Sequence, residues 1–274
     1  MVKRRNPEET VLDNDITQLS RSLAKGLDIL QCYEPGETFL GNKDICERVG
    51  LPKQTVSRLT RTLVALGYLS YSESLCKYKL GSGVLALAYP LLAGMNFKHI
   101  VRPFMDDFAN AVGGSVSMGQ RFRQQIMFVE SSTVRGTANA AAEVGSLVPI
   151  HLSAIGKAYL GSVAITERVR IVAELGLDND GQTALHKQIS QVASDLATQG
   201  FCVSSAVFAK PHAPAYNLAR IAAAVPLCRP IDGEHFVINC GFPRYSKTPE
   251  QMAQDIGPRL VNMVRNLESA LGLR

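Results

Sequence analysis

A helix, a tight break and a second helix, followed directly by two short strands, restrict what this 274-residue chain can fold into more than any other feature. The first of these helices begins near Asn42, which can cap it, and residues 50–52 (Gly-Leu-Pro) break it. The second begins at Pro52 or Lys53, because proline is tolerated in the first turn of a helix. Its expected buried stripe is Val56, Leu59, Leu63 and Leu66.

Two strand-like runs follow the second helix. Residues 68–72 and 77–80 have the composition of strands, and polar residues between them predict a hairpin. An earlier helix, capped by Ser22, is indicated by leucines at helical spacing and ends before Pro35. Those leucines are Leu23, Leu27 and Leu30. Three helices and a hairpin between residues 19 and 81 are typical of a winged helix-turn-helix, a DNA-binding module.

The distribution of charge supports this interpretation. The whole chain has a formal net charge of +5. Residues 51–80 contain five basic residues and one acid, so most of the excess lies on the second helix and the hairpin. Neutralisation of DNA phosphates requires such a concentration, while arginine and glutamine can also read base edges. We expect DNA contacts from Lys53, Gln54, Thr55, Ser57, Arg58, Arg61, Lys77 and Lys79.

An ordinary solvated surface is the alternative for these positions. A solvated helix face usually mixes acids with bases, and the exposed positions of residues 53–62 include no acid, which favours DNA contact. Lys77 and Lys79 lie on one face of their strand, where lysines also protect a free sheet edge against aggregation. Both interpretations therefore stay open for these two lysines.

The remainder of the chain changes character twice. Residues 82–95 are apolar and helical in pattern, and we expect this linker helix to pack against a second copy of itself. From residue 96 onward, strand-like and helical segments alternate, which predicts a mixed domain of strands and helices. The expected order is a leader (1–18), a winged helix-turn-helix (19–81), the linker helix (82–95) and a second domain (96–274). The predicted fold class is α+β.

Composition excludes several classes of protein. The hydrophobic fraction of 46% suits a packed core, yet no apolar run reaches the roughly 20 residues that a membrane span needs. Residues 1–15 contain no apolar core of a signal peptide. The six cysteines form no CxxC pair, which indicates reduced thiols. We therefore expect a cytoplasmic protein without a membrane partner.

Several segments, in order, resemble the IclR family of bacterial transcription regulators. In the N-terminal part they are SLAKGLDIL (22–30), LPKQTVSRL (51–59), LVALGYL (63–69) and YKLG (78–81). In the C-terminal part they are PIH (149–151), GKA (156–158) and IAAAVP (221–226). The resemblance implies a homodimeric or homotetrameric repressor or activator that binds a palindromic operator. It also implies a GAF-like C-terminal domain that binds a small metabolite, with no cofactor and no metal.

The resemblance further implies an effector pocket. Matching positions are Thr137, Ala140, Ala154 and Ile155 on one side, Leu218, Arg220 and Cys240 on the other, and Lys210 at the rim. The family often has neutral or acidic residues where Lys210 and Arg220 stand, which is consistent with both facing solvent; if Arg220 points inward instead, it can bind a carboxylate as a bidentate pair. Small apolar walls and the free N–H groups of a helix start at Ala154 favour an aromatic or short aliphatic acid.

An enzyme with an appended helical domain is the alternative function. The Gly156–Lys157 pair lacks the glycine and the hydroxyl residue of a phosphate-binding loop. Residues 115–119 lack the first glycine of a nucleophile elbow. The five histidines form no close metal-ligand pair. RNA binding is a third possibility, which the lack of aromatic stacking residues in the basic region disfavours.

Overall fold

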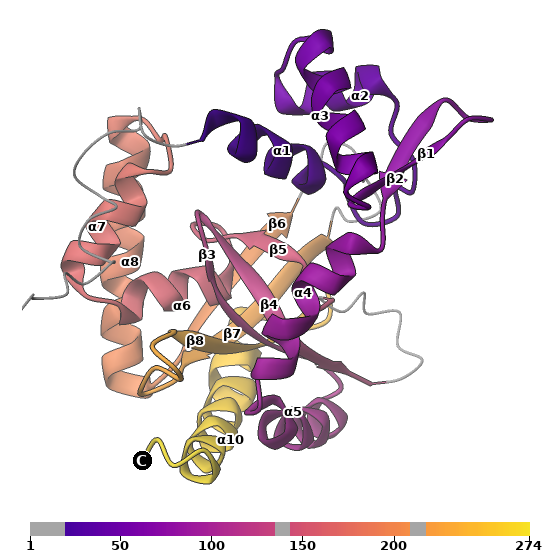
Figure 1. Cartoon of the computed structure of the whole chain (residues 1–274). Coiled ribbons are helices and arrows are strands. Elements are labelled where there is room, and N and C mark those ends of the chain that lie inside the picture. Colours follow the sequence, from indigo (N-terminus) through magenta and orange to yellow (C-terminus); the bar gives the residue numbers. More distant parts are fainter. Residues whose placement is uncertain (1–19, 135–142, 209–217) are drawn as a thin grey trace, which may run out of the picture. The chain divides into compact units, whose positions relative to one another are not determined.

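The computed structural model describes residues 20–134, 143–208 and 218–274 (Figure 1). The chain forms two compact units, and the boundary between them in the sequence lies between Gly94 and Met95. The first unit is mainly helical, and the second is built on one antiparallel sheet with helices on both faces. The predicted α+β class is confirmed. The further division of the first unit into a winged helix and a linker stays a prediction.

The first unit contains the three helices and the hairpin that the sequence predicts. Their bounds are α1 (Arg21–Gln31), α2 (Asn42–Val49), α3 (Lys53–Ala65), β1 (Leu69–Ser72), β2 (Lys77–Leu80) and α4 (Gly83–Gly94). β1 and β2 pair antiparallel. One apolar core joins α1, α2, α3 and β1 through Ile29, Leu40, Ile45, Val56, Leu59, Leu63 and Leu69.

Three local predictions in this unit are wrong. Ser20, and not Ser22, caps α1, because its Oγ accepts a hydrogen bond from Leu23 N at 3.4 Å. Gly41 takes the cap position of α2, where its N–H donates to Asp44 Oδ2 at 2.8 Å. Leu66 is 63% exposed because it follows the last turn of α3, after the buried stripe has ended.

The second unit holds a six-stranded antiparallel sheet in the order β5-β4-β3-β8-β7-β6. The strands are β3 (Ser115–Phe122), β4 (Gln125–Thr133), β5 (Leu147–Pro149), β6 (Cys202–Phe208), β7 (Leu218–Pro226) and β8 (Phe236–Pro243). The helices are α5 (Lys98–Val112), α6 (Ala154–Ser162), α7 (Ile165–Ala173), α8 (Asn179–Gln199), α9 (Pro249–Gln251) and α10 (Gly257–Ala270).

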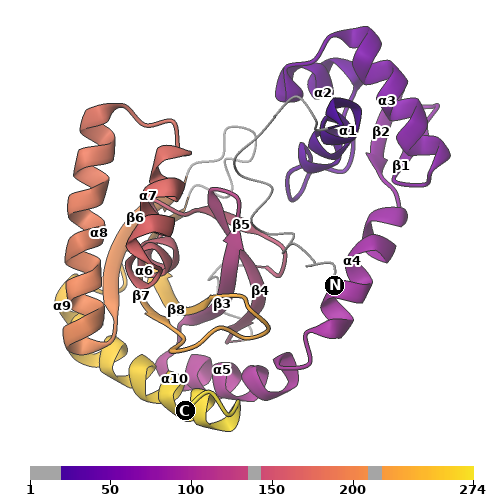
Figure 2. The same cartoon turned by 60° about the vertical axis from the view of Figure 1, so that its left-hand side comes forward.

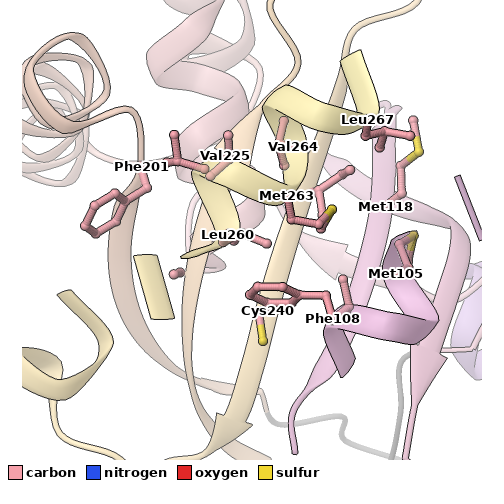
Figure 3. Close-up of a cluster of buried hydrophobic side chains, with 14 of the residues drawn as sticks. Met105, Phe108, Met118, Phe201, Val225, Cys240, Leu260, Met263, Val264 and Leu267 are labelled. Atoms are coloured by element: carbon pink, nitrogen blue, oxygen red, sulfur yellow. The ribbon is translucent and has the colours of Figure 1, made fainter. Parts of the chain in front are cut away.

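Two apolar cores lie on opposite faces of this sheet. α5 and α10 cover one face, and their side chains meet the strands in the cluster that Figure 3 shows. α6 and α8 cover the other face (Figure 2). A second apolar cluster there includes Ile155, Leu160 and Ile189. We call these the α5/α10 face and the α6 face.

Two helical segments of this unit have features that a local sequence pattern does not indicate. α8 begins at Asn179, because Asp178 Oδ1 accepts from Gly181 N at 2.8 Å and starts a helix in a polar segment that looks like a loop. The C-terminal helical segment contains a π-helical turn at Met252–Ile256. The turn ends at Gly257, which packs so closely on Phe201 that a Cβ would lie 2.2 Å from its ring.

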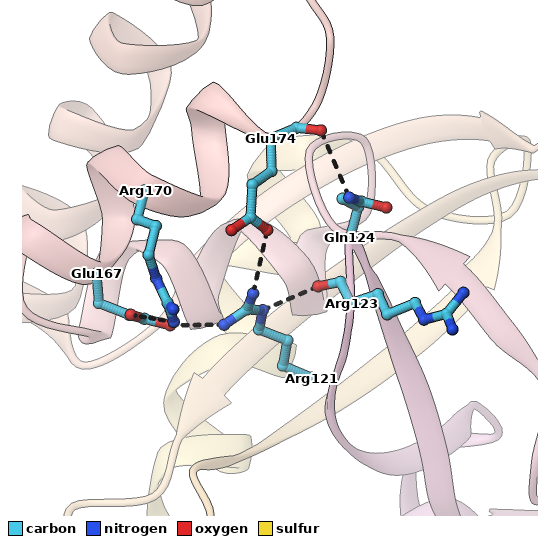
Figure 4. A network of polar contacts seen from close by, with 6 residues as sticks. All are labelled: Arg121, Arg123, Gln124, Glu167, Arg170 and Glu174. Carbon is cyan, nitrogen blue, oxygen red and sulfur yellow. Dashed lines mark hydrogen bonds and ion pairs between the residues drawn. The ribbon is translucent and has the colours of Figure 1, made fainter. Parts of the chain in front are cut away.

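A polar network attaches α7 to the turn between β3 and β4 (Figure 4). Arg121 Nη1 lies 2.5 Å from Glu167 Oε1, and Arg121 Nη2 lies 3.6 Å from Glu174 Oε2. Arg170 holds the same Glu167 carboxylate at 2.7 Å. Because the groups are only partly exposed and share partners, the network fixes this corner of the unit more firmly than an isolated surface pair would.

Within the described residues, no single helix is long and apolar enough to cross a membrane. Taken together, α4 and α5 satisfy the criteria of length and composition, but the chain bends sharply between them.

Candidate functional site

The outer surface of α3 carries the predicted DNA-binding side chains. Lys53, Gln54, Arg58 and Arg61 are exposed, whereas Thr55 and Ser57 are half-buried. The opposite side of α3 supplies Val56, Leu59 and Leu63 to the core. The helix has no acidic residue, so its exposed side is uniformly positive.

Hydrogen bonds hold α3 in place against α2. Asn42 Nδ2 at the start of α2 donates to Ser57 Oγ at 2.8 Å, so the Ser57 side chain connects the two helices. Arg48 at the end of α2 donates to both carboxylate oxygens of Glu37, at 2.5 and 2.7 Å, and to Cys32 O at 3.0 Å. This bond to Glu37 raises the pKa of Arg48 above its ordinary value. A bidentate pair of this kind fixes α2 in a single orientation.

The hairpin is attached to the same core. Tyr78 on β2 pairs with Leu40 through two backbone hydrogen bonds of 2.8 and 2.9 Å. Its ring lies 4.9 Å from the ring of Tyr71 on β1. Lys77 and Lys79 lie on the other face of β2, and both are exposed. The ammonium group of Lys79 also lies 5.9 Å from the centre of the Phe39 ring.

α4 is an apolar helix with no buried residue among the described parts of the chain. Leu85, Leu87, Tyr89 and Leu91 are between 55% and 70% exposed. Its start is fixed on the turn after α3, because Gly83 N donates a hydrogen bond to the carbonyl oxygen of Gly67, 3.1 Å away. α4 therefore presents an apolar surface without any charged residue.

In the second unit, the alternation of side chains decides which residues share a face. Along β8, Ile238 and Cys240 belong to the core on the α5/α10 face, whereas Val237 belongs to the core on the α6 face. Successive strand residues point to opposite faces. Asn239 and Gly241 therefore lie on the α6 face, together with Val237.

The structure does not bring Cys240 together with Ala154 and Ile155. Ala154 and Ile155 are buried in the core on the α6 face, and Cys240 is fully buried on the opposite face. Burial raises the pKa of the Cys240 thiol to about 12. A single ligand cannot contact side chains on both faces of an intact sheet, so Cys240 does not share a pocket wall with Ala154 and Ile155, whereas the neighbouring Asn239 lies on their face.

Polar side chains of β3, β4, β6 and β8 lie on the α6 face of the sheet. Ser115 pairs with Gly241, Ser117 pairs with Asn239, and Ser117 Oγ lies 3.2 Å from Ser131 Oγ. On β6, Ser204 lies opposite Ala222, which belongs to the α6-face core. We call this group the polar sheet patch: Ser115, Ser117, Ser131, Ser204 and Asn239.

Most atoms of this patch are shielded from solvent. Ser115 and Ser117 are 5% and 2% exposed. The Oδ1 atom of Asn239 is buried and has no hydrogen-bond partner among the described residues. A buried acceptor without a partner carries a free-energy cost that a ligand N–H or O–H would remove.

Two basic side chains border the patch. Lys157 on α6 donates from Nζ to Ser204 Oγ at 3.2 Å, and burial lowers the pKa of this lysine. His151 precedes α6, and burial together with the Lys157 charge lowers its pKa. Lys157 therefore supplies a half-buried positive charge, which would bind an anionic ligand more strongly than an exposed lysine would, whereas the lowered pKa of His151 favours its neutral form.

The start of α6, the helix that covers this face of the sheet, supplies unpaired N–H groups. Ser153 caps the helix, since its Oγ accepts from Gly156 N at 3.1 Å. The N–H groups of Ala154 and Ile155 have no partner within the helix, because the first turn of every α-helix leaves such donors. An anion at this position is also favoured by the helix dipole.

Arg220 lies on the α6 face of the sheet. It alternates with Ala222 on β7, and Ala222 belongs to the α6-face core. The side chain is half-buried, and this burial lowers its pKa. Of the two orientations left open by the sequence, the structure shows the inward one.

The remaining predicted pocket residues are less informative. Thr137, Ala140 and Lys210 lie outside the described residues, and Leu218 is described only as the first residue of β7. Sequence reasoning did not single out Lys157, Ser204 and Asn239, which the structure places on the α6 face. Their signal was the polar alternation in the strands, which has no meaning until the buried face of each strand is known.

A separate cleft of about 310 Å³ lies between the end of α8, the end of β7 and α10. Its walls include Gln199, Cys228, Arg265 and Glu268. None of the predicted pocket residues lines it. The described residues also contain no group of three His, Cys, Asp or Glu side chains that could hold a metal ion.

Two family models match this chain. The IclR helix-turn-helix domain matches residues 22–73, and the bacterial transcriptional regulator IclR C-terminal domain matches residues 90–206. Together they cover more than half of the chain. Both describe transcription regulators rather than enzymes.

Individual proteins agree with these models. The transcriptional regulator TsaQ1/TsaQ2 of Comamonas testosteroni is 29% identical over 93% of this chain and 90% of its own length. The crystal structure of an IclR family regulator from Brucella abortus has a TM-score of 0.78 and 31% identity, and covers 94% of this chain and 95% of that one.

A third structure shares the fold at lower identity. It is an IclR homologue complexed with 4-hydroxybenzoate from Microbacterium hydrocarbonoxydans, with a TM-score of 0.63 and 18% identity over 91% of this chain and 99% of that one. With both domain models matched in the expected order, the chain belongs to the IclR family of transcription regulators, with a DNA-binding helix-turn-helix domain and an IclR effector-binding domain.

Proposed function

We propose that this regulator binds a palindromic operator through α3 and β2, and that binding of an organic acid changes its affinity for the operator. The observation that carries the DNA-binding surface is the exposed side of α3, which presents Lys53, Arg58 and Arg61 without any acid. Such a surface binds the major groove of DNA by charge and by hydrogen bonding.

Different residues have different roles in this proposal. Gln54 and Arg58 read base edges, because they lie near the start of α3 and are exposed. Lys77 and Lys79 bind phosphates, because a lysine on a hairpin supplies charge without a planar pattern of donors. Ser57 keeps its contact with Asn42 and can still donate its hydroxyl proton to a phosphate.

A palindromic operator requires two copies of the chain. We propose that the apolar side chains of α4 supply the contact, because Leu85, Leu87 and Tyr89 are more than half exposed in one copy. The assembly is a homodimer or a homotetramer of such dimers. A DNA-binding protein with reduced thiols is expected in the cytoplasm.

The effector site in this proposal is the polar sheet patch together with the start of α6. Lys157 and the free N–H groups of α6 bind a carboxylate, and Asn239 accepts from a hydroxyl of the same molecule. The neighbour from Microbacterium hydrocarbonoxydans, which binds 4-hydroxybenzoate, supports a hydroxylated aromatic acid as the class of ligand.

The operator surface is tested by identifying operators through genome-wide footprinting and measuring their affinity for the full chain. Arg58→Ala is expected to weaken operator binding by roughly 1–3 kcal/mol and to relax specificity at one position. Arg229→Ala, an exposed arginine in the second unit, is the matched control and leaves affinity unchanged. Unchanged operator affinity in Arg58→Ala would remove this surface from the proposal.

The effector site is tested by calorimetric titration with 4-hydroxybenzoate. Lys157→Met is expected to weaken binding about tenfold, because it removes one charge-assisted hydrogen bond. Lys187→Met, an exposed lysine on α8, is the control. If both variants bind the acid as the unaltered chain does, the patch is not the site.

A further inference from the structure

Glu130 is a buried carboxylate on the side of the sheet opposite the polar sheet patch. Its side chain is 1% exposed, and only Glu268 shares this burial among the acids that the structure describes. Removing a carboxylate from water is costly unless cations and donors compensate it. Its partners therefore define a rigid contact.

Both cations that compensate Glu130 lie on one turn of α5. Arg102 Nη2 lies 2.7 Å from Glu130 Oε1, and Lys98 Nζ lies 3.4 Å from Glu130 Oε2. Ser131 N also donates to Oε1 at 3.2 Å. The first turn of α5 is thus ion-paired to one buried carboxylate of β4, and a hydrogen bond from Ser132 Oγ on β4 to Asp106 joins a later turn of α5.

A β-bulge lies directly beside this charge. Met118 pairs with Glu130, but Gly119 pairs with Phe128, which leaves Val129 without a partner on β3. A bulge interrupts the ladder and lets a strand bend locally. Glu130 and Ser131 follow it, the first pointing to the α5/α10 face and the second to the polar sheet patch.

α5 is connected to α4 by only three residues, and two of them are anchored in the second unit. Met95 is buried in the α5/α10 core, and the ring of Phe97 lies 5.2 Å from the ring of Phe236. The connection between α4 and α5 is therefore short, and the second unit holds two of its three residues.

We propose that Glu130 is a positioning residue that couples the effector site to the linker helix. A ligand that displaces Ser131 or Ser117 shifts β4 at the bulge, and the buried carboxylate carries Lys98 and Arg102 with it. The coupling is strong because a charge pair in a water-poor environment resists separation. The inference rests on the proposed effector site, and it adds the route by which that site acts.

The test replaces the ligand with added bulk, so it does not depend on the identity of the effector. Ser131→Leu is made in the full-length chain, and hydrogen exchange of the α5 amides at residues 98–105 is measured by mass spectrometry. We expect at least an approximately three-fold change in exchange rate, because local opening of α5 responds to the shift of β4. In the Glu130→Gln background, Ser131→Leu is expected to leave these rates unchanged.

Two further variants keep the result decisive. Glu167→Gln removes an ion-paired acid far from α5, and in that background the response to Ser131→Leu is expected to persist. Arg102→Gln changes a side chain that is 60% exposed, so the protein folds, and it is expected to reduce the response as Glu130→Gln does. An equal response with and without Glu130, or no response in the unaltered chain, overturns the coupling. Failure of 4-hydroxybenzoate to bind instead overturns the ligand class alone.

Discussion

The two units of this protein use polar residues in opposite ways. In the first unit, the basic side chains of α3 and β2 are exposed, and the core beneath them is entirely apolar apart from Thr60, among the residues that the structure describes. In the second unit, serines, Lys157 and Glu130 are wholly or partly buried around the sheet.

This difference fits the two kinds of ligand that we propose, DNA for the first unit and a small acid for the second. A DNA phosphate backbone is a large polyanion, so exposed cations bind it by counterion release without leaving water themselves. A small acid offers one charge and few contacts, so its site has to be shielded to gain useful affinity. Substitution of one exposed cation therefore leaves the other DNA contacts in place, whereas the shielded site of the second unit depends on the packing of the side chains around it.

The largest expected effect comes from breaking the packing at the start of α6. A Cβ on Gly156 would lie 2.1 Å from Ile150 O, so Gly156→Ala forces the helix away from the preceding segment. We expect the second unit to lose about 2–3 kcal/mol of unfolding free energy, despite the better helix propensity of alanine. Urea unfolding of the full chain measures this loss.

Gly94→Ala is the matched control, because nothing lies within 4 Å of a Cβ at the end of α4. It is expected to leave the stability of the second unit unchanged. If both alanine variants unfold at the same urea concentration, the close approach of Gly156 to Ile150 does not limit the packing of α6.

A smaller effect is expected on the exposed surface. Lys77→Ala removes one fully solvated cation from β2, so it should weaken binding to every DNA sequence alike and lower the slope of log affinity against log salt by about 1. Filter binding at several salt concentrations measures this slope. A loss confined to one operator sequence, with an unchanged slope, would mean that Lys77 reads a base instead.

The smallest effect is a dependence of stability on pH. Burial and Lys157 lower the pKa of His151 in the folded chain, so the unfolded chain binds a proton more readily. Stability contributed by neutral His151 is therefore present above the ordinary histidine pKa near 6.5 and is lost as the pH falls toward the lowered folded value.

His151→Gln is expected to flatten this part of the stability profile between about pH 7 and pH 5. Thermal unfolding in matched buffers measures it, with His186→Gln on α8 as the control. A profile that is equally steep in His151→Gln would assign the acid sensitivity to other groups.

The first unit was predictable because its signals are local. The break at residues 50–52, the apolar stripe of α3 and the lack of acids on its outer side all lie within a few turns of one another. Errors were confined to ends of helices, as with Ser20 and Leu66, where the competition between neighbouring caps decides the boundary.

The family resemblance identified the second unit, but the positions matched for its pocket were drawn from both faces of the sheet. Cys240 and Asn239 are neighbours in the chain, and a shift of one residue moves a side chain to the other face. Sequence patterning alone does not state which face α6 covers. The polar alternation of β3 and β8 becomes meaningful only once the order of strands is known.

The amino-acid sequence by itself therefore determined the helix-turn-helix, its positive surface and the family, because helix periodicity and charge act over short distances along the chain. Only the tertiary structure decided that Arg220 and Asn239 lie on the α6 face, that Lys157 reaches Ser204, and that Glu130 binds α5. Those contacts join residues 28 to 47 positions apart, or depend on strand registers that no local pattern encodes.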